Sequence, residues 1–460
     1  MKQIAAKLKH MALAFAALCF AHVPVSAQGI SILSDAETEW FIKQMMAPIL
    51  EQAQIDPRSV NYYIVNDDNL NAFVAGGQNI FVHTGLFTQT KNVAQVVGVM
   101  AHETGHISGA HLARRGDGAG GPTAITLASM LLGVAAIAAG AGDAGIGIIT
   151  GGQQAATRAF FSFTRVQEAS ADQAAARFLE GAELSGRGLL ETFRQFASQE
   201  YRIGIPQDPY VRTHPLSGDR VANLERAVTT SQYYEAPMPP EWVYYYDRVV
   251  GKIEGFKMPF DATLRKYPVS DKTVKARYAR AYAYHKAVEI EKSMAEITEL
   301  LAIRPGDPYY LELKGQLMFE NGNVEASLDP LRKAAKAAPS EAQILTLLGR
   351  ALIASENSDH LNEAVKTLEL SSFLDAENPF TWYQLSIAYN QSGMKGEAGL
   401  AAAERYALIG QFGPAISNAR RALETLEPGT PKWLRAQDLL FLAGQSVEAD
   451  GRQRRRNLTQ

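Results

Sequence analysis

The sequence has almost no cysteine: its single cysteine, Cys19, lies in a short apolar stretch near the amino terminus. That stretch, residues 11–20, follows three lysines and precedes the small residues Val25-Ser26-Ala27. This order is typical of a secretory signal peptide, so we predict that residues 1–27 are removed. A membrane anchor is the alternative, but the apolar run is short of the roughly 20 residues that span a bilayer. The mature chain would have no thiol, so core packing or a metal must stabilise it.

The chain also lacks an excess of either charge, with 45 basic residues, 48 acidic residues and a net charge of −3 at pH 7. Without a basic field, nucleic acid is not an expected partner. The sequence contains no glycine-rich phosphate loop of the Walker type, so no nucleotide-driven step is expected. Its 460 residues of ordinary globular composition are enough for two or three domains.

The first half of the chain has the pattern of an α+β domain. Ser34 and Glu37 form a capping-box sequence ahead of apolar residues at helical spacing. Residues 61–66 and 78–83 are rich in β-branched and aromatic side chains and predict two strands, with a Gly-Gly turn between them. Residues 92–114 predict a helix with a valine-rich face.

The second half is repetitive. Pro305 and Pro339 lie 34 residues apart, and so do Gly315 and Gly349. A helix–turn–helix period of this length resembles the tetratricopeptide repeat and predicts an α-solenoid. We expect repeats over residues 273–450, a proline-rich linker at 233–272, a basic tail at 451–460, and three extra residues near 356–362. The small-residue position of the repeat is expected at Ala281, Gly315, Gly349 and Ser386.

The strongest chemical signal is the H-E-x-x-H motif of residues 102–106. On a helix, His102 and His106 face the same way and can bind one metal ion, with Glu103 beside it. Neutral imidazole suits zinc, and a catalytic zinc site has three protein ligands and an open position for water.

Two residues are candidates for the third ligand. Glu168 and Asp172 lie four residues apart on a predicted helix, so the first could bind the metal and the second could hold a ligating histidine. His111 is the other candidate, but extended H-E-x-x-H motifs place their third histidine one residue further on, at Leu112. We therefore favour Glu168.

These motifs together resemble the M48 family of zinc metallopeptidases, and Asn71-Ala72-Phe73 and Gly85-Leu86 resemble that family's lead-in to the motif. The predicted signal peptide and the carboxyl-terminal repeats narrow the resemblance to those members of the family that act on outer-membrane proteins. The resemblance implies a catalytic base and one Zn²⁺ per chain: Glu103 is the base, and His102, His106 and Glu168 are the ligands.

The same resemblance singles out Thr213-His214-Pro215 and, after it, Arg220. It implies that His214 lies on a loop over the active site and can fill the open metal position, which would give a latent enzyme. Swung aside, that histidine could donate to the oxyanion that develops during catalysis. Arg220 is expected to lie outside the metal ligands, next to Asp172, and to help hold the ligands in position.

A zinc-bound water and Glu103 would together hydrolyse the peptide bond. We expect a substrate peptide to lie extended against residues 78–83 as an edge strand, through main-chain hydrogen bonds. Such binding would favour unfolded chains, because a folded substrate has no free strand to offer. The candidate substrate-binding residues are Asn71, Gln78, Asn79 and Ile80.

Residues 123–142 carry no charge and are long enough to span a membrane. Because His106 precedes this segment and Glu168 follows it, a single crossing would place the ligands on opposite sides of the membrane. Residues 123–150 are therefore expected either to contact a membrane or assembly machinery from one side, or to form an internal core helix. An inner-membrane protease with two spans is a further alternative.

The sequence thus predicts a mainly α protein: a zincin-like α+β metallopeptidase domain at residues 28–232, followed by an α-solenoid. The expected function is that of a periplasmic zinc endopeptidase with chaperone activity, in quality control and assembly of outer-membrane proteins. Its expected substrates are unfolded or misassembled envelope proteins, and the repeats would bind outer-membrane assembly machinery. The alternative is a non-catalytic, zinc-containing repeat scaffold.

Overall fold

The computed structural model describes residues 31–75, 77–110, 165–197, 214–355 and 357–458. The predicted signal peptide, His111 and the apolar segment 123–150 lie outside these ranges. Within them, no helix combines the length and the apolar composition that a membrane crossing requires.

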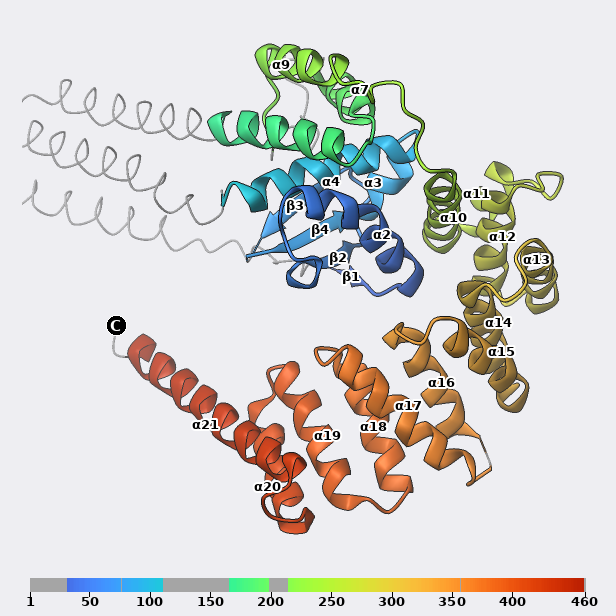
Figure 1. The fold of residues 1–460 in the computed structure, drawn as a ribbon. Helices are drawn as coiled ribbons and strands as arrows, with labels where there is room; N and C mark the ends of the chain where they lie inside the picture. The colour runs from blue at the N-terminus through green and yellow to red at the C-terminus, as the bar shows by residue number, and fades with distance from the viewer. Residues whose placement is uncertain (1–30, 76, 111–164, 198–213, 356, 459–460) are drawn as a thin grey trace, which may run out of the picture.

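The amino-terminal part packs helices on a small mixed sheet (Figure 1). The strands run in the order β1-β2-β4-β3, in which β4 is parallel to β2 and antiparallel to β3. Helices α2 and α4 bury their apolar faces in one core with the sheet. The strands are β1 (Ile32–Leu33), β2 (Asn61–Val65), β3 (Ala72–Ala75) and β4 (Asn79–His83). The helices are α2 (Ala36–Gln52), η1 (Pro57–Ser59), α3 (Thr84–Gln89), α4 (Val93–Ser108), residues 165–181, α7 (Arg187–Ala197) and α9 (Gly218–Thr229).

The two predicted strands and the motif helix are confirmed, but two local expectations are wrong. Residues 78–83 do not form an edge strand, because β4 pairs with β2 on one side and β3 on the other. The edge strand on that side is β3, which ends just before the Gly-Gly pair. Helix α2 is capped by Asp35 and not by Ser34: the Asp35 carboxylate accepts the N–H of Thr38 at 2.8 Å.

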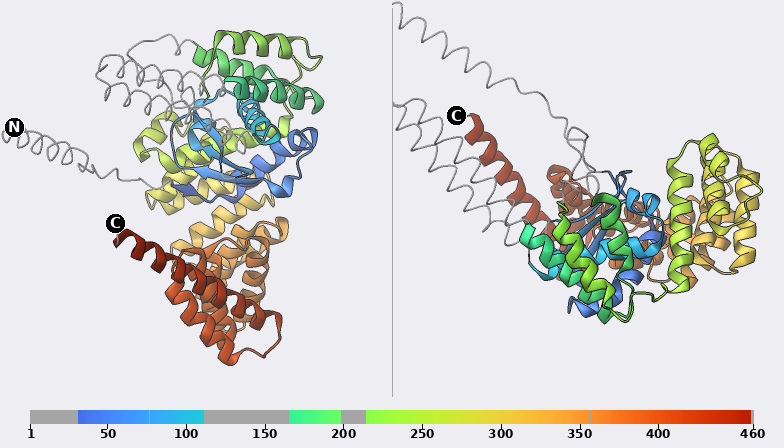
Figure 2. Two further views of the ribbon diagram at one scale, coloured as in Figure 1. Left: turned by 90° about the vertical axis from the view of Figure 1, so that its left-hand side faces the viewer. Right: turned by 90° about the horizontal axis from the view of Figure 1, so that it is seen from above.

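The carboxyl-terminal part is a right-hand column of paired helices in Figure 1 that curves back below the sheet. Figure 2 shows the same two-part arrangement from the side and from above. The helices of the carboxyl-terminal part are α12 (Val274–Lys286), α13 (Ile290–Ile303), α14 (Pro308–Glu320), α15 (Val324–Ala337), α16 (Ala342–Ala354), α17 (His360–Leu374), α18 (Pro379–Gln391), α19 (Lys395–Leu408), α20 (Phe412–Thr425) and α21 (Pro431–Leu458).

The helical period matches the sequence pattern. The first helices of the pairs begin at Val274, Pro308, Ala342 and Pro379, at intervals of 34, 34 and 37 residues. The longer interval contains the enlarged α16–α17 connection and the longer α17. Gly315 lies against Leu331 of the paired helix, which explains why only a small residue fits there: a Cβ at this position would lie 2.4 Å from the Leu331 side chain.

The residues expected to form the linker, 233–272, are largely helical. Helices α10 (Pro240–Lys257) and α11 (Phe260–Lys266) fill most of it. Proline stands at the first position of α10, where its missing N–H has no partner to lose. The prolines therefore begin a helix that packs on both parts of the molecule.

A buried ionic cluster joins the two parts through α10. The fully buried Arg248 lies 2.6 Å from a carboxylate oxygen of Glu37 in α2 and 2.6 Å from Asp307, the cap of α14. Its guanidinium carbon lies 3.9 Å from the ring centroid of Tyr310. The Tyr278 hydroxyl donates to Glu37 at 2.6 Å. These charges satisfy one another, so the solenoid is held in one orientation.

Replacing Arg248 with methionine is expected to destabilise the protein by about 3–5 kcal/mol, because two buried carboxylates lose their cation. The shift of the urea midpoint on the full chain measures this effect. Lys333→Met is the control, since its pair with Asp329 is exposed on both sides and should be worth under about 1 kcal/mol. Equal shifts in the two variants would contradict the assignment.

Candidate metal centre

Helix α4 brings the motif into the interior at its carboxyl end. Asn92 caps the helix by accepting the N–H of Gln95 at 3.1 Å, and the valine-rich face packs in the core. His102, Glu103 and His106 are consequently buried, at 0%, 1% and 6% exposure. Three ionisable side chains this deep in a protein must find partners among themselves or in a bound ion.

The helix of residues 165–181 crosses α4 closely and supplies two carboxylates. A Cβ placed on Gly105 would lie 2.7 Å from the backbone oxygen of Ala171, so no larger residue fits between the motif histidines. This crossing brings Glu168 and Asp172, both almost fully buried, to the face of α4 that carries the histidines.

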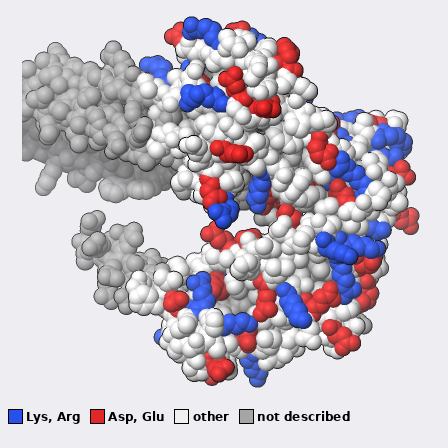
Figure 3. All heavy atoms as spheres, viewed as in Figure 1, with Lys and Arg blue, Asp and Glu red and all other residues white. Residues whose placement is uncertain are grey.

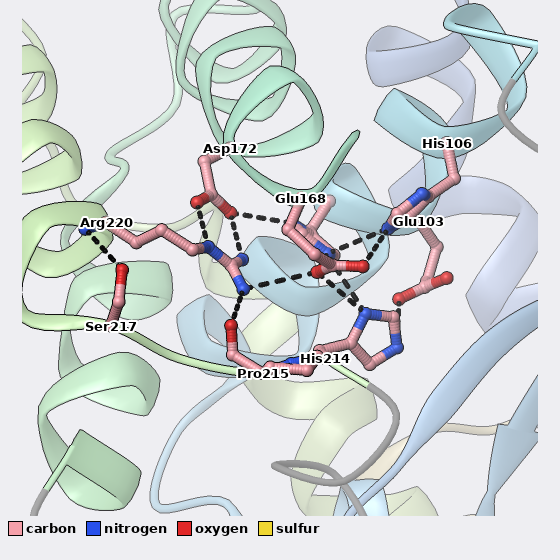
Figure 4. A network of polar contacts seen from close by, with 9 residues as sticks. Glu103, His106, Glu168, Asp172, His214, Pro215, Ser217 and Arg220 are labelled. Carbon is pink, nitrogen blue, oxygen red and sulfur yellow. Dashed lines mark hydrogen bonds and ion pairs between the residues drawn. The ribbon is translucent and has the colours of Figure 1, made fainter. Parts of the chain in front are cut away.

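Four side chains converge on one point (Figure 4). His102 Nε2 lies 3.1 Å from His106 Nε2 and 3.3 Å from Glu168 Oε2. His106 Nε2 lies 3.4 Å from Glu168 Oε1. His214 Nδ1 lies 3.3 Å from His102 Nε2 and 3.2 Å from Glu168 Oε2. One donor atom of each residue falls within a group no wider than 4.8 Å.

These separations fit a tetrahedral metal ion. Zinc bonds to nitrogen or oxygen of about 2.0–2.2 Å imply separations between ligand atoms of roughly 3.3–3.6 Å. Five of the six separations, at 3.1–3.4 Å, are close to this range, and the whole group is no wider than 4.8 Å. Burial acts to lower the pKa of His102, but Asp172 and Glu168 outweigh it and raise that pKa to about 10. The surroundings thus favour positive charge, which a cation would supply.

A further layer orients His102. Its Nδ1 lies 2.9 Å from Asp172, which in turn accepts two hydrogen bonds of 2.7 Å from Arg220. Arg220 also donates to the backbone oxygen of Pro215 at 2.7 Å, next to His214. Burial would raise the pKa of Asp172, but Arg220 and His102 lower it overall, so the carboxylate stays charged. Figure 4 shows this chain from Asp172 to Pro215.

Glu103 lies beside the four-residue group. Its carboxylate is 3.4 Å from His214 Nε2. Burial raises the pKa of Glu103, and His214, His102 and the backbone N–H of Val74 in β3 partly oppose this. A carboxylate with a raised pKa next to a metal position suits an exchange of protons near neutral pH.

The four candidate substrate-binding residues have other visible contacts. Gln78 accepts a hydrogen bond of 2.6 Å from Ser59, and Asn79 accepts one of 2.9 Å from Asn61. Ile80 is fully buried in the core. The backbone oxygen of Asn71 accepts the N–H of His83 at 3.0 Å. Their roles toward substrate stay predictions.

Sequence reasoning missed Phe193 of α7. Its ring meets His102 edge-on, with 6.2 Å between the centroids, and Arg220 lies 5.1 Å from the ring centroid. The only signal in the sequence is its place on the apolar face of a helix, which a core residue shares. Phe193 therefore closes the back of the site without a motif of its own.

An H-E-x-x-H helix whose histidines meet a glutamate from a later helix is the donor arrangement of a metallopeptidase. Residues 36–228 match the family model for Peptidase family M48. The donor arrangement and this match define the chain as a metalloprotease, with a region similar to Peptidase family M48.

The chain is also similar over most of its length to named relatives. It is 24% identical over 387 residues to the beta-barrel assembly-enhancing protease of Yersinia pestis, covering 80% of this chain and 76% of the relative. It is 23% identical over 403 residues to the protein of that name from Escherichia coli K12, covering 87% and 81%. A thermophilic TPR protein of Thermus thermophilus aligns with 40% of this chain and 99% of its own length, at 16% identity and a TM-score of 0.23.

Gly105→Ala is expected to weaken metal binding at least tenfold, because the added methyl group would force α4 and the helix of residues 165–181 apart. Titration of the purified chain with zinc against a chelator of known affinity measures this. Gly413→Ala is the matched control, since a Cβ there meets nothing within 4 Å. Full zinc affinity in the Gly105 variant would show that the close crossing does not set the site.

Proposed function

We propose that the chain is a zinc-dependent endopeptidase that binds one Zn²⁺ through His102, His106 and Glu168, with Glu103 as catalytic base. The observation that carries this proposal is the convergence of four donor atoms within 4.8 Å beside a buried carboxylate. The metallopeptidase fold gives the reaction class, and the donor set gives the metal: imidazole nitrogen and carboxylate oxygen suit zinc.

Zinc bound by these residues would act as a Lewis acid and would lower the pKa of a water. Glu103 accepts a proton from the attacking water and passes it to the leaving amine. Asp172 fixes the orientation of His102 through Nδ1, which leaves Nε2 facing the group of ligand atoms. Arg220 holds Asp172 and the backbone next to His214 in fixed positions.

A substrate strand would add to β3, the open edge next to α4. The backbone N–H and C=O groups of Asn71, Phe73 and Ala75 point toward β4, as the hydrogen bond from His83 N–H to Asn71 O indicates. The backbone groups of Ala72 and Val74 therefore face away from the sheet, and Val74 reaches toward Glu103. A peptide bonded to this edge would pass the catalytic base in an extended form, which an unfolded segment can adopt.

The names of the relatives suggest the biological setting. We infer an exported, periplasmic enzyme that removes unfolded or misassembled envelope proteins during outer-membrane protein assembly. The solenoid would contribute a surface for assembly machinery or substrates and some chaperone activity. The candidate signal peptide at 1–27, a place for residues 123–150 at a membrane surface, and the domain boundaries at 232 and 273 belong to this proposal.

His214 would serve as a latch in this scheme. Its Nδ1 lies among the ligand atoms, so it would take the position that a catalytic water needs. Movement of the Pro215 backbone, to which Arg220 is bonded, would withdraw it. Once withdrawn, the imidazole could donate to the oxyanion.

The same fourth donor favours a second candidate function. A metal closed by four protein side chains is typical of a structural site, and the solenoid could then act as a scaffold without hydrolysis. Under that alternative, Glu103 would have no chemical task. Activity measurements on a Glu103 variant distinguish the two.

Glu103→Gln should lower the rate of casein hydrolysis at least a hundredfold, because no group remains to take the proton. The measurement is made on protein whose zinc content matches that of the parent. Glu180→Gln, a change at an exposed residue of the helix of residues 165–181, is the control and should leave the rate unchanged. An unimpaired Glu103→Gln enzyme would refute the catalytic assignment.

His214→Ala should replace one protein ligand by water. Cobalt substituted for zinc reports this through its visible absorption, whose intensity and position depend on the ligands. We expect the spectrum of the resting parent to change in the variant, and added imidazole to restore it. Identical spectra for parent and variant would contradict the latch.

A further inference from the structure

A cavity of about 490 Å³ lies where the solenoid meets the peptidase part. The start of α2 and the helix α10 line one side, and α12, α14, α16 and α18 line the other. It adjoins a second cavity of about 430 Å³ beside β1 and β2, with which it shares Leu33, Ser34, Gln343 and Asn378. Figure 3 shows the molecule hollowed between its two parts.

The solenoid side of the first cavity uses the same repeat positions in successive helices. Glu312 and Thr346 lie 34 residues apart, and so do Gln316 and Arg350. Because equivalent positions of stacked repeats share one face, these side chains form a continuous inner surface. Phe256 and Phe380, which are 49% and 43% exposed, add apolar rings to the lining.

The acidic side chains of the two cavities outnumber the cations that could neutralise them. Lys252 is paired with Asp35 and Glu37, and Lys257 is paired with Asp68. Arg350 is held between two aromatic rings, 5.2 Å from each centroid, and Lys43 is the remaining cation. Among the described residues, five lining carboxylates have no cation within 4 Å: Glu39, Glu312, Glu341, Asp375 and Glu377.

Glu312 of α14 is half-buried at the wall of the larger cavity. It has no hydrogen bond or ion pair with any described residue, although it lines the larger cavity. Burial raises its pKa to about 8, and nearby Asp35, Glu37 and Glu341 act in the same direction against Lys252. A positively charged ligand group would relieve both effects, whereas an anionic one would add to them.

The second cavity offers backbone as well as charge. Strand β1 pairs only with Ile64 and Val65, so the amino-terminal half of β2 lies beyond its end. Asn61 bonds to β4 through its N–H, so the backbone of Tyr62, one residue on, points to the opposite, cavity side. A strand could pair there, which favours an extended polypeptide over a small cation.

We propose that this interdomain cleft binds an extended polypeptide segment and takes a lysine or arginine side chain at Glu312. The aliphatic part of that side chain would lie against Phe256 and Phe380, and its charged end would reach the carboxylate. The site is separate from the metal centre: it is built from α2, α10 and the solenoid. The inference adds to the proposed peptidase function a means of selecting and holding substrate chains by their charge.

The test uses the full chain carrying Glu103→Gln, which binds without cleaving, and blocked, dye-labelled peptides of sequence Ser-Val-Thr-X-Thr-Val-Ser. With X as lysine, fluorescence anisotropy should give an affinity at least tenfold tighter than with X as norleucine or glutamate. Adding Glu312→Gln should remove this preference, and Glu312→Lys should transfer it to the glutamate peptide. The matched control is Glu291→Gln, on the exposed face of α13.

Equal affinity for the lysine and norleucine peptides, or a lysine preference that survives Glu312→Gln, would overturn the proposal. Spermidine tests the nature of the occupant: displacement of the peptide by equimolar spermidine would point to a free polyamine and refute the polypeptide. The peptidase proposal fails separately. A chain that prefers lysine through Glu312 but hydrolyses nothing would refute hydrolysis and leave the cleft assignment standing.

Discussion

The contact on which the site depends is the close crossing of two helices at Gly105 and Ala171. Side chains larger than hydrogen at Gly105 would separate His102 and His106 from Glu168. A chain of polar contacts continues from this crossing: His102 contacts Asp172, Asp172 accepts hydrogen bonds from Arg220, and Arg220 donates to the backbone beside His214. A residue without a side chain thus sets the distance between groups that carry charge.

Buried charge serves two different purposes in the molecule. At the metal centre, donor atoms of three imidazoles and one carboxylate converge within 4.8 Å, an arrangement that suits an added ion. At the junction, Arg248 is already matched by Glu37 and Asp307 and stacked on Tyr310. The first cluster surrounds a position that a metal ion could occupy, whereas the charges of the second cluster are already paired with one another and hold the two parts of the molecule together. Compensation by neighbouring groups separates the two, since both are almost fully buried.

Patterns that are local in the sequence could be predicted, and patterns that depend on distant partners could not. The motif helix, two strands and the 34-residue period follow from the spacing of residues, as does the enlarged interval before α18. The edge position of β3 depends on which strands pair, and its four residues beside two glycines resemble a turn. The prolines before α10 indicate equally a linker or a helix start, and the structure has the helix.

The candidate site divides in the same way. The sequence put forward His102, His106, Glu168 and His214, and their donor atoms converge in the structure, while their roles as ligands stay predictions. Phe193 could not be found, because an aromatic residue on an apolar helix face is most often a core residue. His111, the competing ligand, lies outside the described residues.

The junction also bears on the order in which the chain assembles. Tyr278 reaches Glu37 across 241 positions of sequence, and Gln343 reaches Glu39 across 304. Contacts of such long range close large loops, and folding is slow where they dominate. The contacts of α2 with the solenoid can therefore be complete only after the third helical pair has emerged. A chain interrupted before that point would leave Glu37 without Arg248 and Tyr278, which ties completion of the amino-terminal part to synthesis of the carboxyl-terminal one.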